Sequence, residues 1–435
     1  MIRFHKPFKL AFFVLLCSVL VIGMTKLAAP DNIAECKSTP EPKLSPEAIA
    51  RYNVKKEAIE TVVANYFQKA ENNGAFVGAG IAIVQGDSII YADGVGKRKV
   101  NDNANVNGHT AFRLGSLSKG FAGVLSAAIE QDGLINWDDP INSYIPDFQL
   151  GSMGNQSPIT IAHILSHSAG TPYHSYTDLV ESGMDLLNIA PRFKNVQPIS
   201  EPGKLYSYQN ALFALSGKIL EKATQCSFDK AINNRLFEPL GMVDATTNHK
   251  DFKTHGNIAL PHRKTRYSWR STRVTNKYDN AIAAGGINAS PTDMAKWMRF
   301  LLGHNPEVLE FNAVSDAFEP KVEIKGKRKY YQRWDGHLSS HYGLGWRIHE
   351  FEDASTEQKQ TMIHHGGSVN DYRNEIALFP DEDLGICVLF NSHTKLAKHV
   401  IPDLHKLIKE ALNDTESKHT NSTVAVLSSK SNSNG

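Results

Sequence analysis

Strand-forming residues gather near the two ends of this chain, and that division restricts its fold more than any other feature. Two β-rich runs, residues 78–85 and 88–91, are separated by Gly86-Asp87, a pair typical of a tight β-hairpin. Strand character returns in three later segments, residues 342–348, 372–379 and 384–390. The sequence therefore predicts an α+β fold in which both ends of the chain form one antiparallel sheet of about five strands.

Helical patterns flank and interrupt these strands. Apolar residues recur at helical spacing in residues 48–72 and 398–412, so we expect an N-terminal and a C-terminal helix to cover the sheet. A long block, about residues 114–302, contains mainly helices and loops and is interpreted as an insertion. Residues 305–340 are polar and irregular and are predicted to form loops. A cleft is expected where the insertion meets the sheet.

The segments outside this fold have simple compositions. Residues 1–29 combine basic residues with a short apolar run, which is typical of a secretory signal peptide, although an uncleaved membrane anchor fits the same pattern. Residues 30–47 are predicted to form a linker, residues 48–413 one domain, and residues 414–435 a disordered tail. We therefore expect an exported protein of the periplasm or cell envelope, anchored to the membrane if the first segment is not cleaved.

Composition excludes several classes of function. The 435-residue chain has a net charge of +2 and no basic cluster, which argues against a nucleic-acid partner. Its four cysteines are too few to indicate a disulfide framework, and Cys387 lies in an apolar strand and is expected in the core. His163 and His167 have the spacing of a zinc-binding helix but lack the glutamate that acts as its base. No metal or other cofactor is therefore expected.

The chemistry is expected at Ser116-Leu-Ser-Lys119, which opens an apolar helical run. Residues three apart on a helix share a face, so Ser116 and Lys119 should lie side by side. A lysine that is buried near a helix N-terminus loses its proton more readily and can then activate the serine as a nucleophile. Two other Ser-x-x-Lys runs occur, Ser227–Lys230 and Ser392–Lys395. We interpret the first of these serines as a helix N-cap and the second as a turn residue.

A second segment could complete such a site. Tyr208 and Asn210 lie two residues apart on a loop before a helix at residues 211–223. The tyrosine could relay protons to a serine or a water, and the asparagine could bind a substrate amide. Tyr278–Asn280 and Tyr372–Asn374 have the same spacing, so spacing alone does not select the first pair.

A third segment, His364-His365-Gly366-Gly367-Ser368, opens a predicted strand. Small residues would let a substrate backbone lie along the strand edge, and a strand N–H can serve an oxyanion hole. A glycine-rich turn before a strand would have the same composition.

The sequence resembles the serine β-lactamase and penicillin-binding-protein superfamily, whose motifs occur in the same order. These are Ser-x-x-Lys, then Tyr-x-Asn, then a basic residue followed by Gly before a strand. The class C-like branch, with its D-alanyl-D-alanine carboxypeptidases, D-aminopeptidases and esterases, is the most similar, since flanking runs such as Tyr-Gly-Leu-Gly-Trp at residues 342–346 also agree. The resemblance covers about residues 48–412 and implies a β-lactamase/transpeptidase-like fold.

The resemblance also implies roles for single residues. Ser116 would be the acylated nucleophile, and Lys119 and Tyr208 would share the proton transfers of acylation and deacylation. Asn210 would contact the amide side chain of the substrate.

His365-Gly366-Gly367 would occupy the place of the family's Lys-Thr-Gly motif, with His365 and Gly367 beside the substrate. The N–H groups of Ser116 and Ser368 would form the oxyanion hole. Histidine is only partly charged near neutrality and Gly366 lacks the hydroxyl of the motif. A substrate carboxylate should therefore be held less firmly, and efficient penicillin hydrolysis is not expected. We place the motif at His365 and not at His364, because Ser368 and Asn370 then fall at the positions that the motif requires.

The sequence thus predicts a serine hydrolase that cleaves an amide or ester through an acyl-enzyme on Ser116, with a D-amino-acid peptidase or carboxypeptidase activity. A carboxylesterase or a class C-like β-lactamase of the same fold is the alternative. A non-catalytic binding protein of the envelope is the alternative from a different class. The expected partner is a small molecule or peptide, such as a cell-wall peptide or β-lactam, and the sequence leaves the oligomeric state open.

Overall fold

The computed structural model describes residues 45–151, 158–352 and 357–431. It divides the chain into a first unit, Met1–Ile49, of which residues 45–49 are described, and a second unit, Ala50–Gly435. The predicted signal or anchor segment and most of the predicted linker lie outside the described residues. Within the described ranges, no helix is both long enough and apolar enough to cross a membrane.

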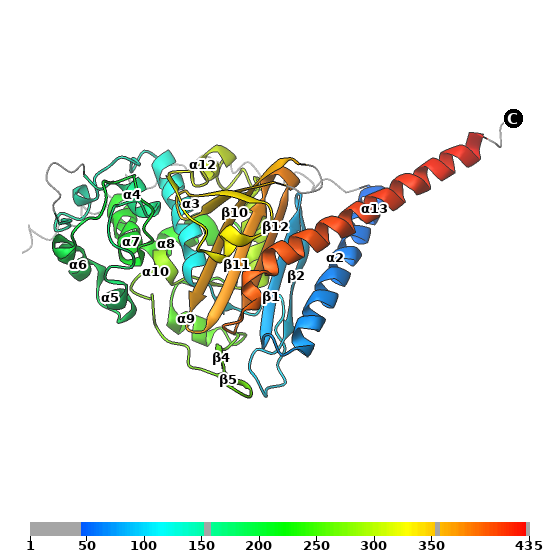
Figure 1. Ribbon diagram of the computed structural model, residues 1–435, viewed down its shortest axis with the longest axis horizontal. Coiled ribbons are helices and arrows are strands. Elements are labelled where there is room, and N and C mark those ends of the chain that lie inside the picture. The colour runs from blue at the N-terminus through cyan, green and yellow to red at the C-terminus, as the bar shows by residue number, and fades with distance from the viewer. Residues whose placement is uncertain (1–44, 152–157, 353–356, 432–435) are drawn as a thin grey trace, which may run out of the picture. The chain divides into compact units, whose positions relative to one another are not determined.

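The second unit is built on one eight-stranded antiparallel sheet in the order β2-β1-β12-β11-β10-β9-β8-β7 (Figure 1). The strands are β1 Gly78–Gln85, β2 Ser88–Gly96, β7 Val322–Glu323, β8 His337–Tyr342, β9 Arg347–Glu352, β10 Lys359–Val369, β11 Tyr372–Phe379 and β12 Leu384–Phe390. The two ends of the chain meet inside the sheet, where β1 pairs with β12. The predicted α+β fold, with an antiparallel sheet made from both ends of the chain, is therefore confirmed.

The sheet has more strands than the five predicted. β7 and β8 come from the region predicted to form loops, and β10 begins at Lys359, before the glycine-rich segment that was predicted to open a strand. β8 carries the polar residues His337, Ser339, Ser340 and His341, so it lacks the apolar run by which the other strands were found.

Helices lie on both faces of this sheet. On one face, two helices share an apolar core with β1 and β12. They are α13 (Val400–Ser431) and α2 (Pro46–Asn72), of which the part in the second unit is meant. On the other face, α11 (Pro291–Leu301) packs on β1, β2 and β12. α13 continues past its predicted end at Leu412, through residues predicted to form a disordered tail, because no Gly or Pro ends the helix there.

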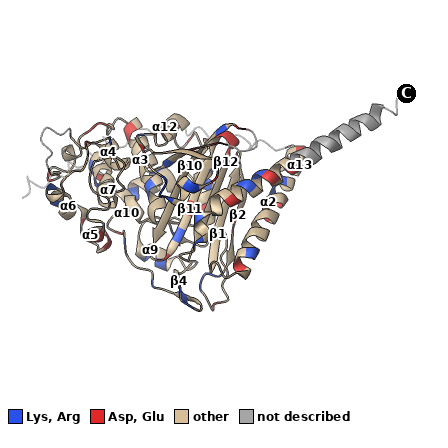
Figure 2. Cartoon of the chain, viewed as in Figure 1, with Lys and Arg blue, Asp and Glu red and all other residues tan. Residues whose placement is uncertain are grey.

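The block between β2 and β7 is mainly helical, as predicted. Its helices are α3 Ser118–Gln131, α4 Ile161–Leu165, α5 Thr177–Glu181, α6 Leu186–Ile189, α7 Asn210–Thr224, α8 Phe228–Ile232, α9 His249–Thr254, α10 Ile282–Gly285, α11 and α12 Phe311–Asp316. Two short strand pairs, β3–β6 (Phe112–Arg113 with Asn288–Ala289) and β4–β5 (His262–Lys264 with Trp269–Ser271), lie in the same block. Figure 2 shows basic and acidic residues interspersed along the elements of the second unit, in line with the absence of a basic cluster in the sequence.

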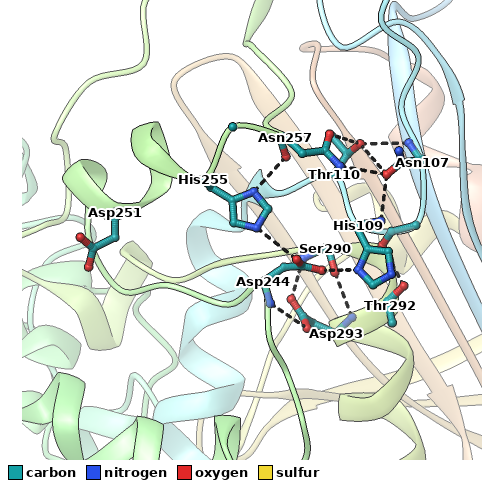
Figure 3. A network of polar contacts seen from close by, with 12 residues as sticks. Asn107, His109, Thr110, Asp244, Asp251, His255, Asn257, Ser290, Thr292 and Asp293 are labelled. Carbon is teal, nitrogen blue, oxygen red and sulfur yellow. Dashed lines mark hydrogen bonds and ion pairs between the residues drawn. The ribbon is translucent and has the colours of Figure 1, made fainter.

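A polar network fixes the segment that leads to the predicted nucleophile (Figure 3). Asp244 lies between two imidazoles, 2.8 Å from His109 Nδ1 and 3.1 Å from His255 Nε2. The Thr110 hydroxyl donates to Asn257 Oδ1 over 2.9 Å. These contacts hold the residues immediately before β3, and β3 runs directly into the site.

Candidate active site

Ser116 lies on a 3₁₀ turn, η1 (Gly115–Leu117), that continues into α3. Gly115 has φ +58°, and a Cβ added to it would lie 2.9 Å from the backbone of Ser368 on β10. Glycine therefore permits both the left-handed backbone and the close approach of this turn to β10. As a result the nucleophile predicted from the sequence sits where the helical insertion meets the sheet.

Lys119 is fully buried one turn further along, with Nζ 3.3 Å from Ser116 Oγ. Its Nζ also donates to Asn210 Oδ1 over 2.8 Å and to the Ala284 carbonyl over 2.7 Å. Burial, and then the nearby charge of Arg347, lower the pKa of Lys119 well below its usual value. A neutral amine has two N–H groups and one lone pair. With both N–H groups taken by these acceptors, the lone pair is left for the serine hydroxyl, so the geometry suits Lys119 as the base.

Tyr208 also contacts the nucleophile. Its hydroxyl donates to Ser116 Oγ over 2.9 Å, and burial raises its pKa. The phenol is therefore protonated at neutral pH and can donate a proton or a hydrogen bond, whereas Lys119 accepts the proton of the serine. Of the three Tyr-x-Asn pairs in the sequence, the one at Tyr208 is the pair that contacts Ser116 directly.

Asn210, the first residue of α7, forms hydrogen bonds through both the oxygen and the nitrogen of its side-chain amide. Its Oδ1 accepts from Lys119, and its Nδ2 donates to the hydroxyl of Tyr278 over 3.1 Å. This asparagine therefore orients the amine of Lys119, and its contact with a substrate amide stays a prediction.

Beside the nucleophile, one edge of β10 has no strand partner among the residues that the structure describes. β10 pairs with β9 only from Lys359 to His364, whereas its pairing with β11 continues to Val369. A two-residue turn joins β10 to β11, so Val369 and Tyr372 form a hydrogen-bonded pair and the preceding pair, which contains Ser368, does not. The Ser368 N–H therefore points to that edge, next to the turn that carries the nucleophile. This geometry supports the predicted oxyanion hole.

His365 and Gly367 lie on the face of β10 that meets η1, since a Cβ added to Gly367 would come within 2.1 Å of the Leu114 carbonyl. His365 is fully buried, with Nδ1 2.9 Å from the Gly366 carbonyl and Nε2 2.9 Å from the hydroxyl of Tyr342. Burial lowers its pKa well below the usual value, so the ring is neutral, Nδ1 donates to the carbonyl and Nε2 accepts from the tyrosine. A neutral ring does not attract a carboxylate by charge, in the direction of the expectation that His365 holds one less firmly than lysine would, and its place beside the substrate stays a prediction.

Arg347, the first residue of β9, was not predicted from the sequence as a site residue. Its Nε and Nη1 are buried without a hydrogen-bond partner among the described residues, and its guanidinium lies 4.7 Å from the ring centre of Tyr331. Its charge lowers the pKa of both Lys119 and His365, which places it near the site. Buried N–H groups without an acceptor are costly, so these two nitrogens fit an anionic group of a ligand. An arginine between Trp346 and Ile348, inside the segment predicted as a strand at residues 342–348, was the signal that could have revealed it.

The other residues that shared a motif or a spacing with the site have structural roles. Ser227 is the N-cap residue of α8, as predicted. Asn374 donates to the Arg113 and Leu114 carbonyls over 2.9 and 3.1 Å. His163 completes the capping box of α4, and His167 accepts from the backbone N–H of Gln209. Among the residues that the structure describes, no group of three His, Cys, Asp or Glu side chains could hold a metal ion.

Comparisons with known proteins show the family of this chain. The Beta-lactamase family model matches residues 63–407. Protein flp from Staphylococcus aureus (strain COL) is 25% identical over 362 residues, which are 82% of this chain and 67% of that protein. The Beta-lactamase of Escherichia coli (strain K12) is 26% identical over 332 residues, 70% of this chain and 79% of that protein.

A solved structure shares the fold. It is described as the octameric penicillin-binding protein homologue from Pyrococcus abyssi, with a TM-score of 0.65 and 22% identity over 79% of this chain and 76% of that one. Because the family model spans most of the chain and the sheet, insertion and Ser116–Lys119 turn lie within it, the chain belongs to the beta-lactamase family.

Proposed function

We propose that this protein is a serine hydrolase that cleaves an amide or ester bond through an acyl-enzyme on Ser116. One observation carries the proposal: Ser116 Oγ lies 2.9 Å from the Tyr208 hydroxyl and 3.3 Å from a Lys119 amine whose two N–H groups already have acceptors. A serine with a positioned base and a positioned acid is equipped for nucleophilic catalysis.

The reaction would run in two halves. Lys119 takes the proton of Ser116 as Oγ attacks the carbonyl carbon, and the oxyanion is stabilised by the N–H groups of Ser116 and Ser368. Tyr208, protonated at neutral pH, donates a proton to the leaving group, and the lysine returns one to the phenol. Water then attacks the acyl-enzyme with the same groups, which regenerates the serine.

For the substrate we propose a peptide of D-amino acids, cleaved as by a carboxypeptidase. The names of the relatives, Beta-lactamase and penicillin-binding protein homologue, support a substrate with the amide bond of such a peptide. The two buried N–H groups of Arg347 that have no partner among the described residues could receive a substrate carboxylate. His365 is neutral and does not attract one by charge. An esterase or β-lactamase activity at the same serine is the second candidate. The segment at residues 1–29 supports export to the envelope.

Intact-mass analysis after incubation with a fluorescent penicillin or a fluorophosphonate tests the proposal. Wild type is compared with Ser116→Ala and with Ser126→Ala, a matched control whose hydroxyl donates to a carbonyl of its own helix. A Ser116-dependent penicillin adduct supports a carboxypeptidase or β-lactamase. An adduct with the fluorophosphonate alone supports an esterase or an unrelated amidase. No adduct with either reagent refutes the nucleophile and favours a non-catalytic binding protein.

A further inference from the structure

A chain of five hydrogen-bonded side chains runs through the sheet from β8 to β11. Its hydrogen bonds join His337 Nε2 to Ser340 Oγ at 2.7 Å, Ser340 Oγ to His349 Nδ1 at 2.8 Å, His349 Nε2 to His364 Nδ1 at 3.3 Å, and His364 Nε2 to Glu375 Oε2 at 2.9 Å. The last four side chains belong to buried residues, whereas His337 is partly exposed. The chain therefore has one end at solvent and one end in the core.

The inner end lies directly behind the strand of the site. A Cβ added to Gly366 would come within 2.8 Å of Glu375 Oε2 and 2.7 Å of the Tyr330 hydroxyl, so Glu375 occupies the space beside that glycine. The charged and titratable groups that face this carboxyl are His364 on β10, Arg373 on β11, Arg347 on β9, Cys387 on β12 and Tyr330 on η5 (Tyr330–Arg333).

Only two arrangements of protons satisfy this chain with neutral rings. When Glu375 is ionised, each imidazole donates from Nε2 and accepts at Nδ1, so that every hydrogen bond points toward the carboxylate. When Glu375 is protonated, each ring takes its other tautomer and every bond is reversed. The two arrangements use the same heavy-atom positions.

We propose that these five side chains form a proton path through which Glu375 exchanges its proton with solvent at His337, so that the charge behind Gly366 follows the external pH. A proton that arrives at His337 Nδ1 releases the Nε2 proton to Ser340 Oγ. The hydroxyl proton of Ser340 passes to His349 Nδ1, the Nε2 proton of His349 passes to His364 Nδ1, and the Nε2 proton of His364 passes to Glu375. One proton enters, one carboxylate is neutralised, and every ring ends uncharged.

The pKa shifts of Glu375 and of the two buried histidines agree with this path. Burial raises the pKa of the Glu375 carboxyl to about 7, whereas burial lowers the pKa of His349 and of His364 well below the usual value. A proton that enters the chain therefore rests on the carboxyl and not on a ring. The path does not depend on any reaction at the site, and its effect on catalysis rests on the proposed function.

The test is a pH-jump experiment on the full-length protein, followed by time-resolved infrared absorption of protonated carboxyl groups. The band of Glu375 is identified as the one that Glu375→Gln removes. We expect Ser340→Ala to slow the appearance of this band after acidification by at least about tenfold, a barrier increase of about 1.4 kcal/mol. The matched control is Ser339→Ala, the neighbouring serine, whose hydroxyl donates to Glu350 over 2.9 Å outside the chain; it should leave the rate unchanged.

A second variant protects the test against misfolding of the first. His337→Gln, at the partly exposed end, keeps a donor for Ser340 but cannot pass a proton onward, and it should slow the band to a similar extent. Rates equal to wild type in this variant and in any folded Ser340→Ala protein overturn the proposal. The absence of a band that depends on Glu375 between about pH 5 and pH 9 overturns it as well. Because no substrate is used, either result is separate from failure of the proposed hydrolase activity.

Discussion

Replacing Asn210 by aspartate tests whether Lys119 is the base, because it puts a negative charge against the amine with almost no change in shape. Oδ1 of Asn210 lies 2.8 Å from Lys119 Nζ. A unit charge at that distance attracts an ammonium by about 6 kcal/mol at an effective dielectric constant of about 20, equivalent to about 4 pKa units. The new carboxyl can share the proton, so the amine should behave as a base only at a pH that is higher by at least about 2 units.

The rate of Ser116 labelling by a fluorophosphonate, followed by intact mass from about pH 5 to pH 10, measures this shift. A base must be deprotonated, so the wild-type rate rises with pH through the pKa of Lys119. Asn210→Asp stabilises the ammonium and should move this rise to higher pH. Asn210→Ala removes the same acceptor without adding charge and should lower the rate while moving the midpoint much less.

The reasoning fails if Asn210→Asp is folded, is labelled, and shows the wild-type midpoint. In that case the amine of Lys119 would not be the group whose deprotonation limits acylation, and the base would have to be sought elsewhere. Circular dichroism of each variant provides the control for folding.

Three further substitutions follow from the same geometry. Tyr208→Phe should slow labelling by about 10²–10⁴-fold, whereas Tyr144→Phe, which removes a remote hydroxyl bonded to an aspartate, should not change the rate. Gly366→Ala should lower the free energy of unfolding in urea by about 1–3 kcal/mol because its Cβ would lie 2.7 Å from a tyrosine hydroxyl; Gly217→Ala on α7, with its nearest contact at 3.5 Å, should not destabilise. Burial raises the pKa of Glu375 from 4.5 to about 7, so the protonated carboxyl stabilises the folded state at low pH and this stabilisation is lost as pH rises from about 4.5 to 7. Over that range the free energy of unfolding of Glu375→Gln should therefore increase by about 3 kcal/mol relative to wild type. Equal pH dependence of the two proteins would contradict this assignment.

The parts of the site that depend on local spacing could be predicted from the sequence. Ser116 and Lys119 are three residues apart on one helical turn, so their proximity follows from helix geometry. The hairpin at Gly86-Asp87 is also local, and β1 and β2 do pair across it. Tyr208 lies far from both residues along the chain, and it was found only through the resemblance to a family.

The parts that depend on sheet register could not be predicted. The lowered pKa of His365 comes from burial and then from the charge of Arg347, a residue on β9. Arg347 lies next to the strand of the site because it is the first residue of β9 and pairs with His364, where the pairing of β10 with β9 stops. A shift of one residue in either pairing would turn these side chains to the other face, and no short sequence pattern encodes that choice.

The pairing of β1 with β12 has a consequence for how the protein comes to be made. β1 is the first strand of the described sheet to be synthesised, but β12, which covers its inner edge, is the last of them. Contacts between such distant parts of the chain form slowly, and until they form β1 keeps an unpaired apolar edge that is prone to join other chains. Synthesis through β12 must therefore precede closure of the sheet, and a nascent chain that has not yet made β12 is a ready substrate for chaperones that hold unfolded proteins.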